Sequence, residues 1–299
     1  MEVRPISPVL GAELFGVSLA DGVDDHTFEA IHRAFLDHGV LVFRNQRTLP
    51  PDVQVAVAER FGPLHTHPAA PTADQHPAIF VIHAHRDSRV ANGNGWHSDV
   101  SCDPEPPMAT MLQIQRPPAG GGGDTLFASM EAAWATLPET WRAQLRPLSA
   151  RHESEHIYRG RYADRGVDDA DVVYPASVHP VVRTHPETGR PSLYINRSFT
   201  TALVDVDPEE SSQLLRRLFN HVERPEFQIR LRWEENDVAL WDNRCLQHFA
   251  IWDYWPEERK GHRVSIHGDR PYFDPAAPDA PSSPIRMSLG PLAEKPRTA

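Results

Sequence analysis

Two histidines and an aspartate are the residues of this sequence best suited to chemistry. His97 and Asp99 stand two positions apart in the run Trp96-His97-Ser98-Asp99, and His248 follows far downstream. Two imidazoles and one carboxylate are the ligand set of a non-haem Fe(II) facial triad, which leaves one face of the metal open. The open positions can take a chelating 2-oxo acid and dioxygen. The pattern therefore predicts His97, Asp99 and His248 as the catalytic metal ligands of an iron oxygenase.

Two arginines follow His248 closely and can place fixed cations near the open face of the metal. They are Arg259 and Arg263. A guanidinium offers a planar fork of donors to a carboxylate or sulfonate and stays charged at all working pH values. The alternative is that each arginine forms a surface ion pair with the neighbouring Glu257 or Glu258.

Spacing alone is weak support for these assignments. The chain has 17 histidines, and His85-Arg86-Asp87 repeats the same His-x-Asp pattern. The glycine run 120–123 lacks the Gly-Lys-Ser/Thr of a phosphate-binding loop, because Asp124 stands where the cation should be. A tight turn fits the glycines better. We expect this turn to lead Thr125 into a strand, with its hydroxyl pointing into a barrel.

Composition narrows the class of protein. The chain has 299 residues and a formal net charge of −11, which argues against nucleic acid or an anionic membrane as the main partner. It has no apolar run of about 18 residues and no signal-peptide layout at its start, so we expect a cytoplasmic enzyme. The only cysteines are Cys102 and Cys245. We interpret them as buried small hydrophobes, with a redox pair or extra metal ligands as the alternative.

Short apolar runs between turn signals predict a mostly β fold with inserted helices. Helices are expected over 24–37, 50–62, 208–222 and 130–145, the last divided at Pro138. The opening segment 1–23 is expected to form a short strand and turns. Further strands are expected over 40–43, 79–82, 109–115, 178–183, 192–195, 226–233, 238–241 and 264–267.

This pattern suits a double-stranded β-helix, or jelly roll, formed as a single domain over residues 1–273. In such a fold the His97/Asp99 region and the His248 region can face each other across the barrel mouth. From residue 274 to 299 the chain is rich in proline, alanine and serine. We expect that segment to be a disordered tail.

Several separated motifs follow one another along the chain. They are Trp96-His97-Ser98-Asp99-Val100, Gly123-Asp124-Thr125-Leu126, the stretch from His179 to Pro186, Phe199-Thr200-Thr201, Trp241-Asp242-Asn243-Arg244 with Gln247-His248, and Gly268-Asp269-Arg270-Pro271. In this order they resemble the taurine dioxygenase family of Fe(II)/2-oxoglutarate-dependent dioxygenases. The resemblance runs from about residue 5 to 273.

The resemblance implies which residues bind the metal and the co-substrate. His97, Asp99 and His248 match the iron ligands of the family. Thr125 and Arg259 match the residues that hold the distal carboxylate of 2-oxoglutarate. The implied cofactors are thus Fe(II), 2-oxoglutarate as co-substrate, and dioxygen.

The resemblance also implies a substrate pocket. Arg263 matches the arginine that grips the substrate's sulfonate, His67 matches a pocket histidine, and Phe199 matches an aromatic wall. His67 can equally be a structural histidine, and Phe199 can be ordinary core. Two departures from taurine dioxygenase, Ala70 in place of a tyrosine and Gly93 in place of an asparagine, predict a differently shaped pocket. Residues 151–177 resemble the family poorly.

The implied activity is hydroxylation of a C–H bond in a small anionic substrate, such as a sulfonate, sulfate ester or carboxylate. If the hydroxylated carbon bears a leaving group, the product collapses to an aldehyde. The first alternative is a desaturation or another oxidative tailoring step on the same scaffold. More remote alternatives are a zinc hydrolase with the same ligands and a non-catalytic binding jelly roll. By analogy with the family, the chain can form a homo-oligomer, either a dimer or a tetramer.

Overall fold

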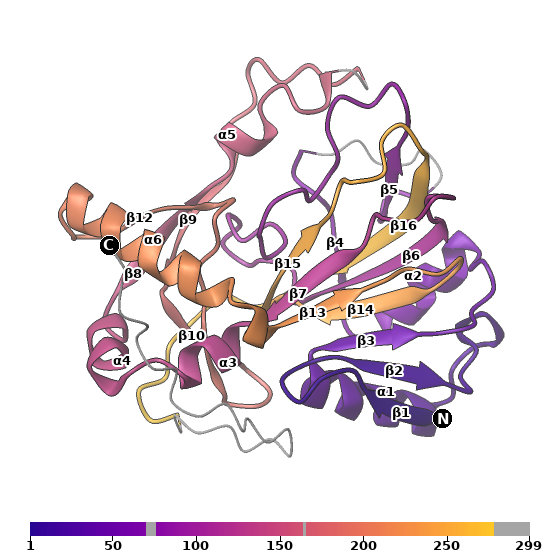
Figure 1. Ribbon diagram of the computed structural model, residues 1–299, viewed down its shortest axis with the longest axis horizontal. Coiled ribbons are helices and arrows are strands. Elements are labelled where there is room, and N and C mark those ends of the chain that lie inside the picture. Colours follow the sequence, from indigo (N-terminus) through magenta and orange to yellow (C-terminus); the bar gives the residue numbers. More distant parts are fainter. Residues whose placement is uncertain (70–75, 164–165, 278–299) are drawn as a thin grey trace.

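A computed structural model describes residues 1–69, 76–163 and 166–277 of the chain. Ala70 and residues 278–299, which make up most of the expected tail, lie outside the described residues. The described part is mostly strands, and its two principal sheets face each other (Figure 1). Within it, no helix is both long enough and apolar enough to cross a lipid bilayer.

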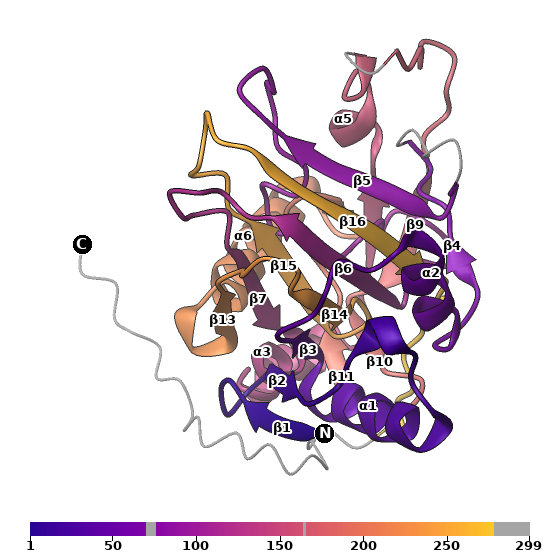
Figure 2. The ribbon, with the colours of Figure 1, turned by 90° about the vertical axis from the view of Figure 1, so that its right-hand side faces the viewer.

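The largest sheet has eight strands. Seven of them lie side by side in the order β1 (Glu2–Pro5), β2 (Ala12–Phe15), β3 (Val40–Phe43), β14 (Val238–Asp242), β6 (Ala109–Arg116), β16 (Arg259–Ile266) and β4 (Leu64–His65). The eighth, β5 (Ile79–Ala84), pairs with β16 (Figure 2). Strand β16 is therefore held between β5 and β6 along most of its length.

Both faces of this sheet are covered. Helices α1 (Asp25–His38) and α2 (Pro51–Glu59) pack on one face. The other face meets a three-stranded sheet of β13 (Gln228–Leu231), β7 (Thr125–Ser129) and β15 (Leu246–Ala250). Alternation along β3 shows this division, because Leu41 and Phe43 join the core under the helices while Val40 and Val42 join the core between the sheets. This arrangement is the predicted double-stranded β-helix.

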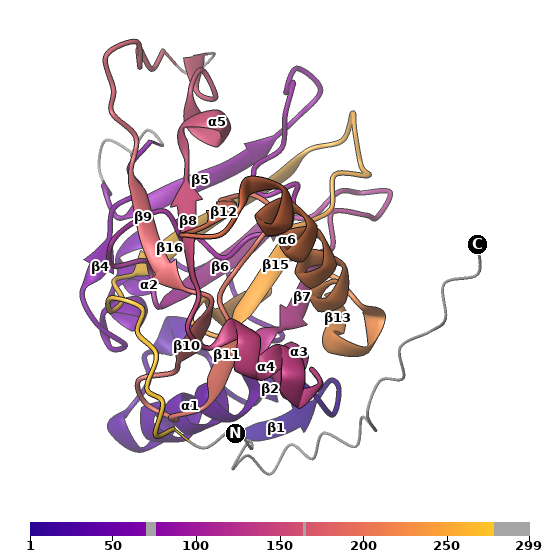
Figure 3. The same ribbon diagram turned by 90° about the vertical axis from the view of Figure 1, so that its left-hand side faces the viewer.

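The remaining elements form a third layer against one end of the barrel. They are β8 (Ser149–Glu153), β9 (Ala176–Pro180), β10 (Val182–Thr184), β11 (Pro191–Leu193), β12 (Thr200–Leu203), α3 (Met130–Ala135), α4 (Glu139–Leu145), α6 (Pro208–Val222) and the short turn η3 (Pro225–Phe227). The other short turn, η1 (Leu19–Asp21), packs with α2 on the helix-covered face of the largest sheet instead. Figure 3 shows α3, α4 and α6 gathered on this side, around a core of their own. The short helix α5 (Glu155–Tyr158) stands apart from them, beyond β8 (Figure 1).

The expected helices are confirmed, including the division of 130–145 at Pro138. Asp24 and Asp207 cap α1 and α6 by accepting hydrogen bonds from backbone amides of the first turns. Two expected strands differ from those observed. The strand expected over 178–183 breaks after Pro180, and that expected over 226–233 covers only Gln228–Leu231, after a turn at Pro225. Proline has no N–H to donate to a strand ladder, which suits Pro180 to the end of a strand and Pro225 to the turn before one.

Candidate active site

A pair of backbone hydrogen bonds joins the two regions that carry the candidate metal ligands. The amide of His97 donates to the carbonyl of His248 at 3.0 Å, and the amide of His248 donates back to the carbonyl of His97 at 2.8 Å. The Ser98 hydroxyl also donates to the carbonyl of Leu246 at 2.5 Å. These bonds fasten the 97–99 loop to β15, and the two imidazole rings stand 4.1 Å apart between centroids.

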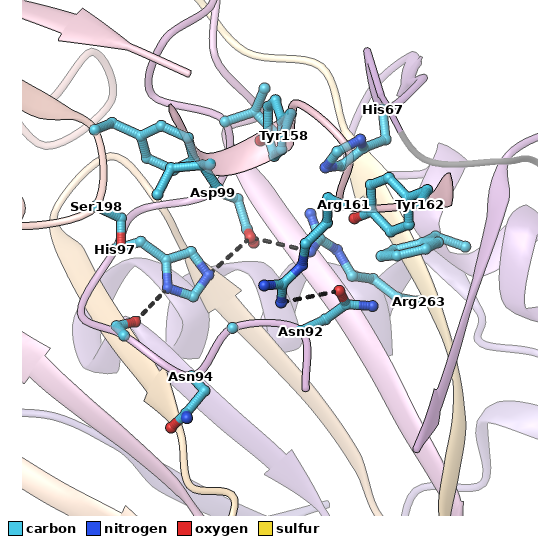
Figure 4. Close-up of a pocket in the computed structure, with 16 residues that line it drawn as sticks. His67, Asn92, Asn94, His97, Asp99, Tyr158, Arg161, Tyr162, Ser198 and Arg263 are labelled. Carbon is cyan, nitrogen blue, oxygen red and sulfur yellow. Dashed lines mark hydrogen bonds and ion pairs between the residues drawn. The ribbon is translucent and has the colours of Figure 1, made fainter. Parts of the chain in front are cut away.

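The three side chains converge on one small volume. His97 Nε2 lies 3.6 Å and His248 Nε2 lies 3.8 Å from the same oxygen, Asp99 Oδ1. All three residues are buried, and their ligand atoms lie within 4.8 Å of one another. His97 Nδ1 bonds to the carbonyl of Gly95 at 2.7 Å, which fixes the proton there and leaves Nε2 as a lone-pair donor (Figure 4). This donor set fits one divalent transition-metal ion.

Neighbouring groups keep Asp99 ionised, which is the form that binds a metal. Its Oδ2 accepts a hydrogen bond from Thr110 at 2.7 Å, and Arg263 lies 3.1 Å from Oδ1. Burial works to raise the pKa of Asp99, but the charge of Arg263 and the other donors around the carboxylate outweigh it and hold that pKa well below its usual value. Burial, with His97 nearby, lowers the pKa of His248. At neutral pH the site therefore presents an ionised carboxylate and a neutral imidazole, as metal binding needs.

Thr125 and Arg259 meet at the indole of Trp233. The indole N–H donates to Thr125 Oγ1 at 3.0 Å, and the Arg259 guanidinium lies 5.7 Å from the ring centroid. Only 4% of Arg259 is exposed, and within the described part of the chain its Nε and Nη2 have no hydrogen-bond partner. Burial lowers the pKa of Arg259. A buried cation with unused donors beside a hydroxyl is suited to bind an anion such as a carboxylate.

The alternative of surface ion pairs for the two arginines is wrong. Glu258 pairs with Arg116 and His83, and Glu257 accepts a hydrogen bond from the amide of Gly120. Neither glutamate pairs with Arg259 or Arg263 in the described structure. The glycine run instead leaves room for the Arg259 side chain, because a Cβ atom at Gly123 would stand 3.0 Å from Arg259 Cδ.

A pocket opens beside His97 and Asp99 and contains the three residues expected to contact substrate. Phe199 lines it together with His67 and Arg263, which Figure 4 labels. Burial first, and then the charge of Arg263, lowers the pKa of His67 to about 3, so its imidazole is neutral. Phe199 belongs to both the pocket wall and a small hydrophobic cluster with Tyr158. The Arg263 guanidinium lies over Phe80, 5.8 Å from the ring centroid.

Among the pocket residues that sequence reasoning missed, three come from one segment. Tyr158, Arg161 and Tyr162 come from the end of α5 and the loop after it, inside the segment that resembles the family poorly. The alternation of aromatic and cationic residues in Tyr158-Arg159-Gly160-Arg161-Tyr162 was the available signal. Gly93 also lines the pocket, with φ +77, and a Cβ there would stand 3.3 Å from the His97 ring. A side chain at this position would therefore press on a metal ligand.

A second group of potential ligands is already satisfied by protein contacts. His185, Asp242 and Cys245 lie close together and are buried. Both Asp242 oxygens accept hydrogen bonds from Arg244, at 2.9 and 2.7 Å, and His185 Nε2 lies 3.0 Å from Oδ2. This carboxylate is committed to a buried ion pair. Cys245 and Cys102 are free and buried, and burial raises the pKa of both thiols, which supports the interpretation of small hydrophobes.

Behind the metal loop lies a buried polar cluster around His152. Ser101 Oγ accepts a hydrogen bond from the Asn196 amide at 2.9 Å and shares another with His152 Nδ1 at 3.0 Å. Burial, together with nearby His179, lowers the pKa of His152 to about 3. A neutral His152 thus helps to hold Ser101, two residues beyond Asp99.

Comparisons with known proteins agree with this geometry. The profile of the family described as taurine catabolism dioxygenase TauD, TfdA matches residues 2–265. An alkylsulfatase of Acinetobacter baylyi is 34% identical, over 90% of this chain and 86% of its own. An alpha-ketoglutarate-dependent sulfate ester dioxygenase of Pseudomonas putida is 35% identical, over 91% of each chain. The crystal structure of a taurine dioxygenase from Burkholderia xenovorans, 33% identical, superimposes with a TM-score of 0.78 over 93% of this chain and 94% of that one.

Replacing any of the three convergent ligands should abolish tight metal binding. We expect His97→Ala, Asp99→Ala and His248→Ala each to lower Fe(II) affinity by more than about 100-fold, measured by anaerobic equilibrium binding on protein shown to be folded. His85→Ala is the matched control, because it disrupts the other His-x-Asp sequence, which lies at the surface. Wild-type affinity in any one of the three variants would contradict the ligand set.

The buried His152 should make the fold sensitive to acid. Its pKa rises from about 3 in the folded protein to about 6.5 in the unfolded chain, so between these values only the unfolded chain takes up the proton. Stability should therefore fall as the pH drops below about 6.5, by up to about 1.4 kcal/mol per pH unit for this group. His152→Gln should flatten the slope measured by urea unfolding, while the exposed His26→Gln should not. An unchanged slope in His152→Gln would show that His152 is not buried in its neutral form.

Proposed function

The chain belongs to the TauD/TfdA family of dioxygenases, and we propose that it hydroxylates an organic sulfate ester or sulfonate that carries no ammonium group. It is an Fe(II)- and 2-oxoglutarate-dependent oxidoreductase that acts on small anionic substrates. The observation that carries the proposal is the charge of the pocket. Arg161 and Arg263 line it, and Asp99 is the sole carboxylate among its described lining residues. An ammonium group would meet cations there and no free carboxylate.

We assign the metal to His97, Asp99 and His248, and the distal carboxylate of 2-oxoglutarate to Arg259 and Thr125. The unused donors of Arg259 support this assignment, because a planar guanidinium can hold a carboxylate through two parallel bonds. When bound, Fe(II) and 2-oxoglutarate supply the oxidising chemistry that converts a C–H bond and dioxygen to an alcohol, with succinate and carbon dioxide as co-products. The protein supplies position and exclusion of water.

Arg263 is assigned to the anionic head of the substrate. Its guanidinium contacts Asp99 and Ser265 and borders the pocket, so an anion bound there lies close to the metal ligands. Phe199 and Tyr158 form an aromatic wall that suits an apolar chain and excludes water. His67, neutral and only partly exposed, can donate to or accept from the head group without adding charge.

The position of the head group determines which carbon is hydroxylated and therefore which product forms. A carbon attached to a sulfate oxygen or to a sulfonate sulfur lies within one or two bonds of the anion that Arg263 holds. Hydroxylation of that carbon gives an unstable product that collapses to an aldehyde and releases sulfate or sulfite. A zinc hydrolase with the same three ligands would leave the buried, unpaired Arg259 without a purpose.

Replacing each of the two arginines in turn should weaken the binding of a different ligand. Under anaerobic conditions, Fe(II) and 2-oxoglutarate should give a visible charge-transfer band, which an alkyl sulfate or sulfonate should shift. Arg259→Gln should weaken 2-oxoglutarate binding, and Arg263→Gln should weaken substrate binding, each by about 10- to 100-fold, as expected for loss of a charged hydrogen bond.

Lys260→Gln is the control for both variants. It removes one charge from the same strand, at the residue that directly follows Arg259. It should leave both affinities near those of the wild type. If Arg259→Gln and Arg263→Gln weakened both ligands equally, the assignment of the two arginines would be wrong. If no sulfate or sulfonate shifted the band, the proposed substrate class would be wrong.

A further inference from the structure

We propose that Arg161 binds a second acidic group of the substrate, so that the preferred substrate is a sulfate ester or sulfonate that also carries a carboxylate. The inference rests on the proposed function, because it takes Arg263 as the site of the sulfur-containing head. It adds a contact from a different element, the loop that follows α5.

Arg161 reaches the pocket from the covering segment, here defined as the described residues between β8 and β9. Its Nη2 donates to the carbonyl of Ala91 at 2.6 Å and lies 3.5 Å from Asn92 Oδ1. Figure 4 shows the guanidiniums of Arg161 and Arg263 extending into the same pocket, with Asn92 beside the first. The two contacts of Arg161 come from neutral groups, which hold the guanidinium in place without cancelling its charge.

The charge of Arg161 has no protein counterpart in the part of the chain that the structure describes. None of the described carboxylates forms an ion pair with it. Among the described residues that line the pocket, Asp99 is the sole carboxylate, and its Oδ1 already lies 3.1 Å from Arg263 and faces the two histidine nitrogens. Two guanidiniums thus share a pocket with one carboxylate, and that carboxylate is the proposed metal ligand. A substrate with two acidic groups would balance this excess of positive charge.

The two arginines are placed to hold separate groups. Arg263 projects from β16 beside the metal ligands, whereas Arg161 belongs to the covering segment and is tied to the backbone at Ala91. Aromatic rings occupy the wall near both, with Phe80 and Tyr162 at 6.4 Å between centroids. We therefore expect the sulfur-containing head at Arg263, a short apolar chain against the rings, and the carboxylate at Arg161.

The test compares pairs of ligands that differ only in the second acidic group. Unbranched alkyl sulfates of four to eight carbons are matched with the corresponding ω-carboxyalkyl sulfates of equal carbon number. Binding to the Fe(II)- and 2-oxoglutarate-loaded protein is measured anaerobically by calorimetry, so no turnover is needed. In the wild type, at least one carboxylated member should bind about tenfold or more tightly than its partner, as a charged hydrogen bond provides.

The decisive quantity is the ratio of the two affinities in each variant. Arg161→Gln should bring the ratio to about one by weakening only the carboxylated ligand, and Arg161→Lys should retain part of the preference. Arg151→Gln, which removes an exposed arginine from neighbouring β8, should keep the wild-type ratio. A purely structural role for Arg161 would weaken both ligands alike and leave the ratio unchanged.

Two outcomes would overturn the proposal. They are a wild type with no preference at any chain length, and an Arg161→Gln variant that keeps the preference, whether its affinities are unchanged or both weakened equally. In each case plain alkyl sulfates still bind the wild type, so the proposed function stands. If neither an alkyl sulfate of either kind nor the corresponding alkyl sulfonate binds the loaded wild type, the proposed function itself fails, and the inference about Arg161 fails with it.

Discussion

The main-chain pairing of His97 with His248 is the constraint on which the rest of the site depends. Two hydrogen bonds, at 3.0 and 2.8 Å, join a loop from the first half of the chain to a strand from the second half. Because paired residues in an antiparallel bridge lie directly opposite each other, both imidazoles are brought to one place. Asp99 then needs only a short turn of the loop to reach the same volume. The ligand geometry follows from backbone pairing, with side-chain rotamers as the last adjustment.

Charge on side chains that do not face open solvent is the second constraint, and only some of these charges are paired within the described structure. At Asp242 the protein surrounds a buried carboxylate with Arg244 and His185, and the charges are matched within the protein. At Arg259 and Arg161 the cations are not matched by any described carboxylate. Burying an unpaired charge is costly unless a ligand pairs with it. The uneven treatment separates the ion pairs that are satisfied within the protein from the two cations to which we assign anionic ligands, and it does so without reference to sequence motifs.

Much of the architecture could be predicted from the sequence, because its strongest patterns are local. Helix α6 has a capping aspartate, a proline in its first turn and a clear apolar stripe, and the predicted bounds are those observed. Strand β16 was predicted only from residue 264 onward, because Arg259, Lys260 and Arg263 resemble a surface segment. Those residues are in a strand because β5 and β6 flank it, and such long-range pairing leaves no local signature. The metal ligands were found because their chemistry is unusual.

The covering segment was the least predictable part of the site for a related reason. It lacks a regular apolar repeat, and its shape depends on contacts such as that of Arg159, which holds Glu155 and the carbonyls of Asp169 and Val172. Such a segment can change its side chains without disturbing the paired strands that carry the metal ligands. The barrel therefore fixes the oxidation chemistry, while the covering segment can set which anion is presented to it. Arg161 lies where this division predicts a determinant of specificity, on the covering segment and facing the metal pocket.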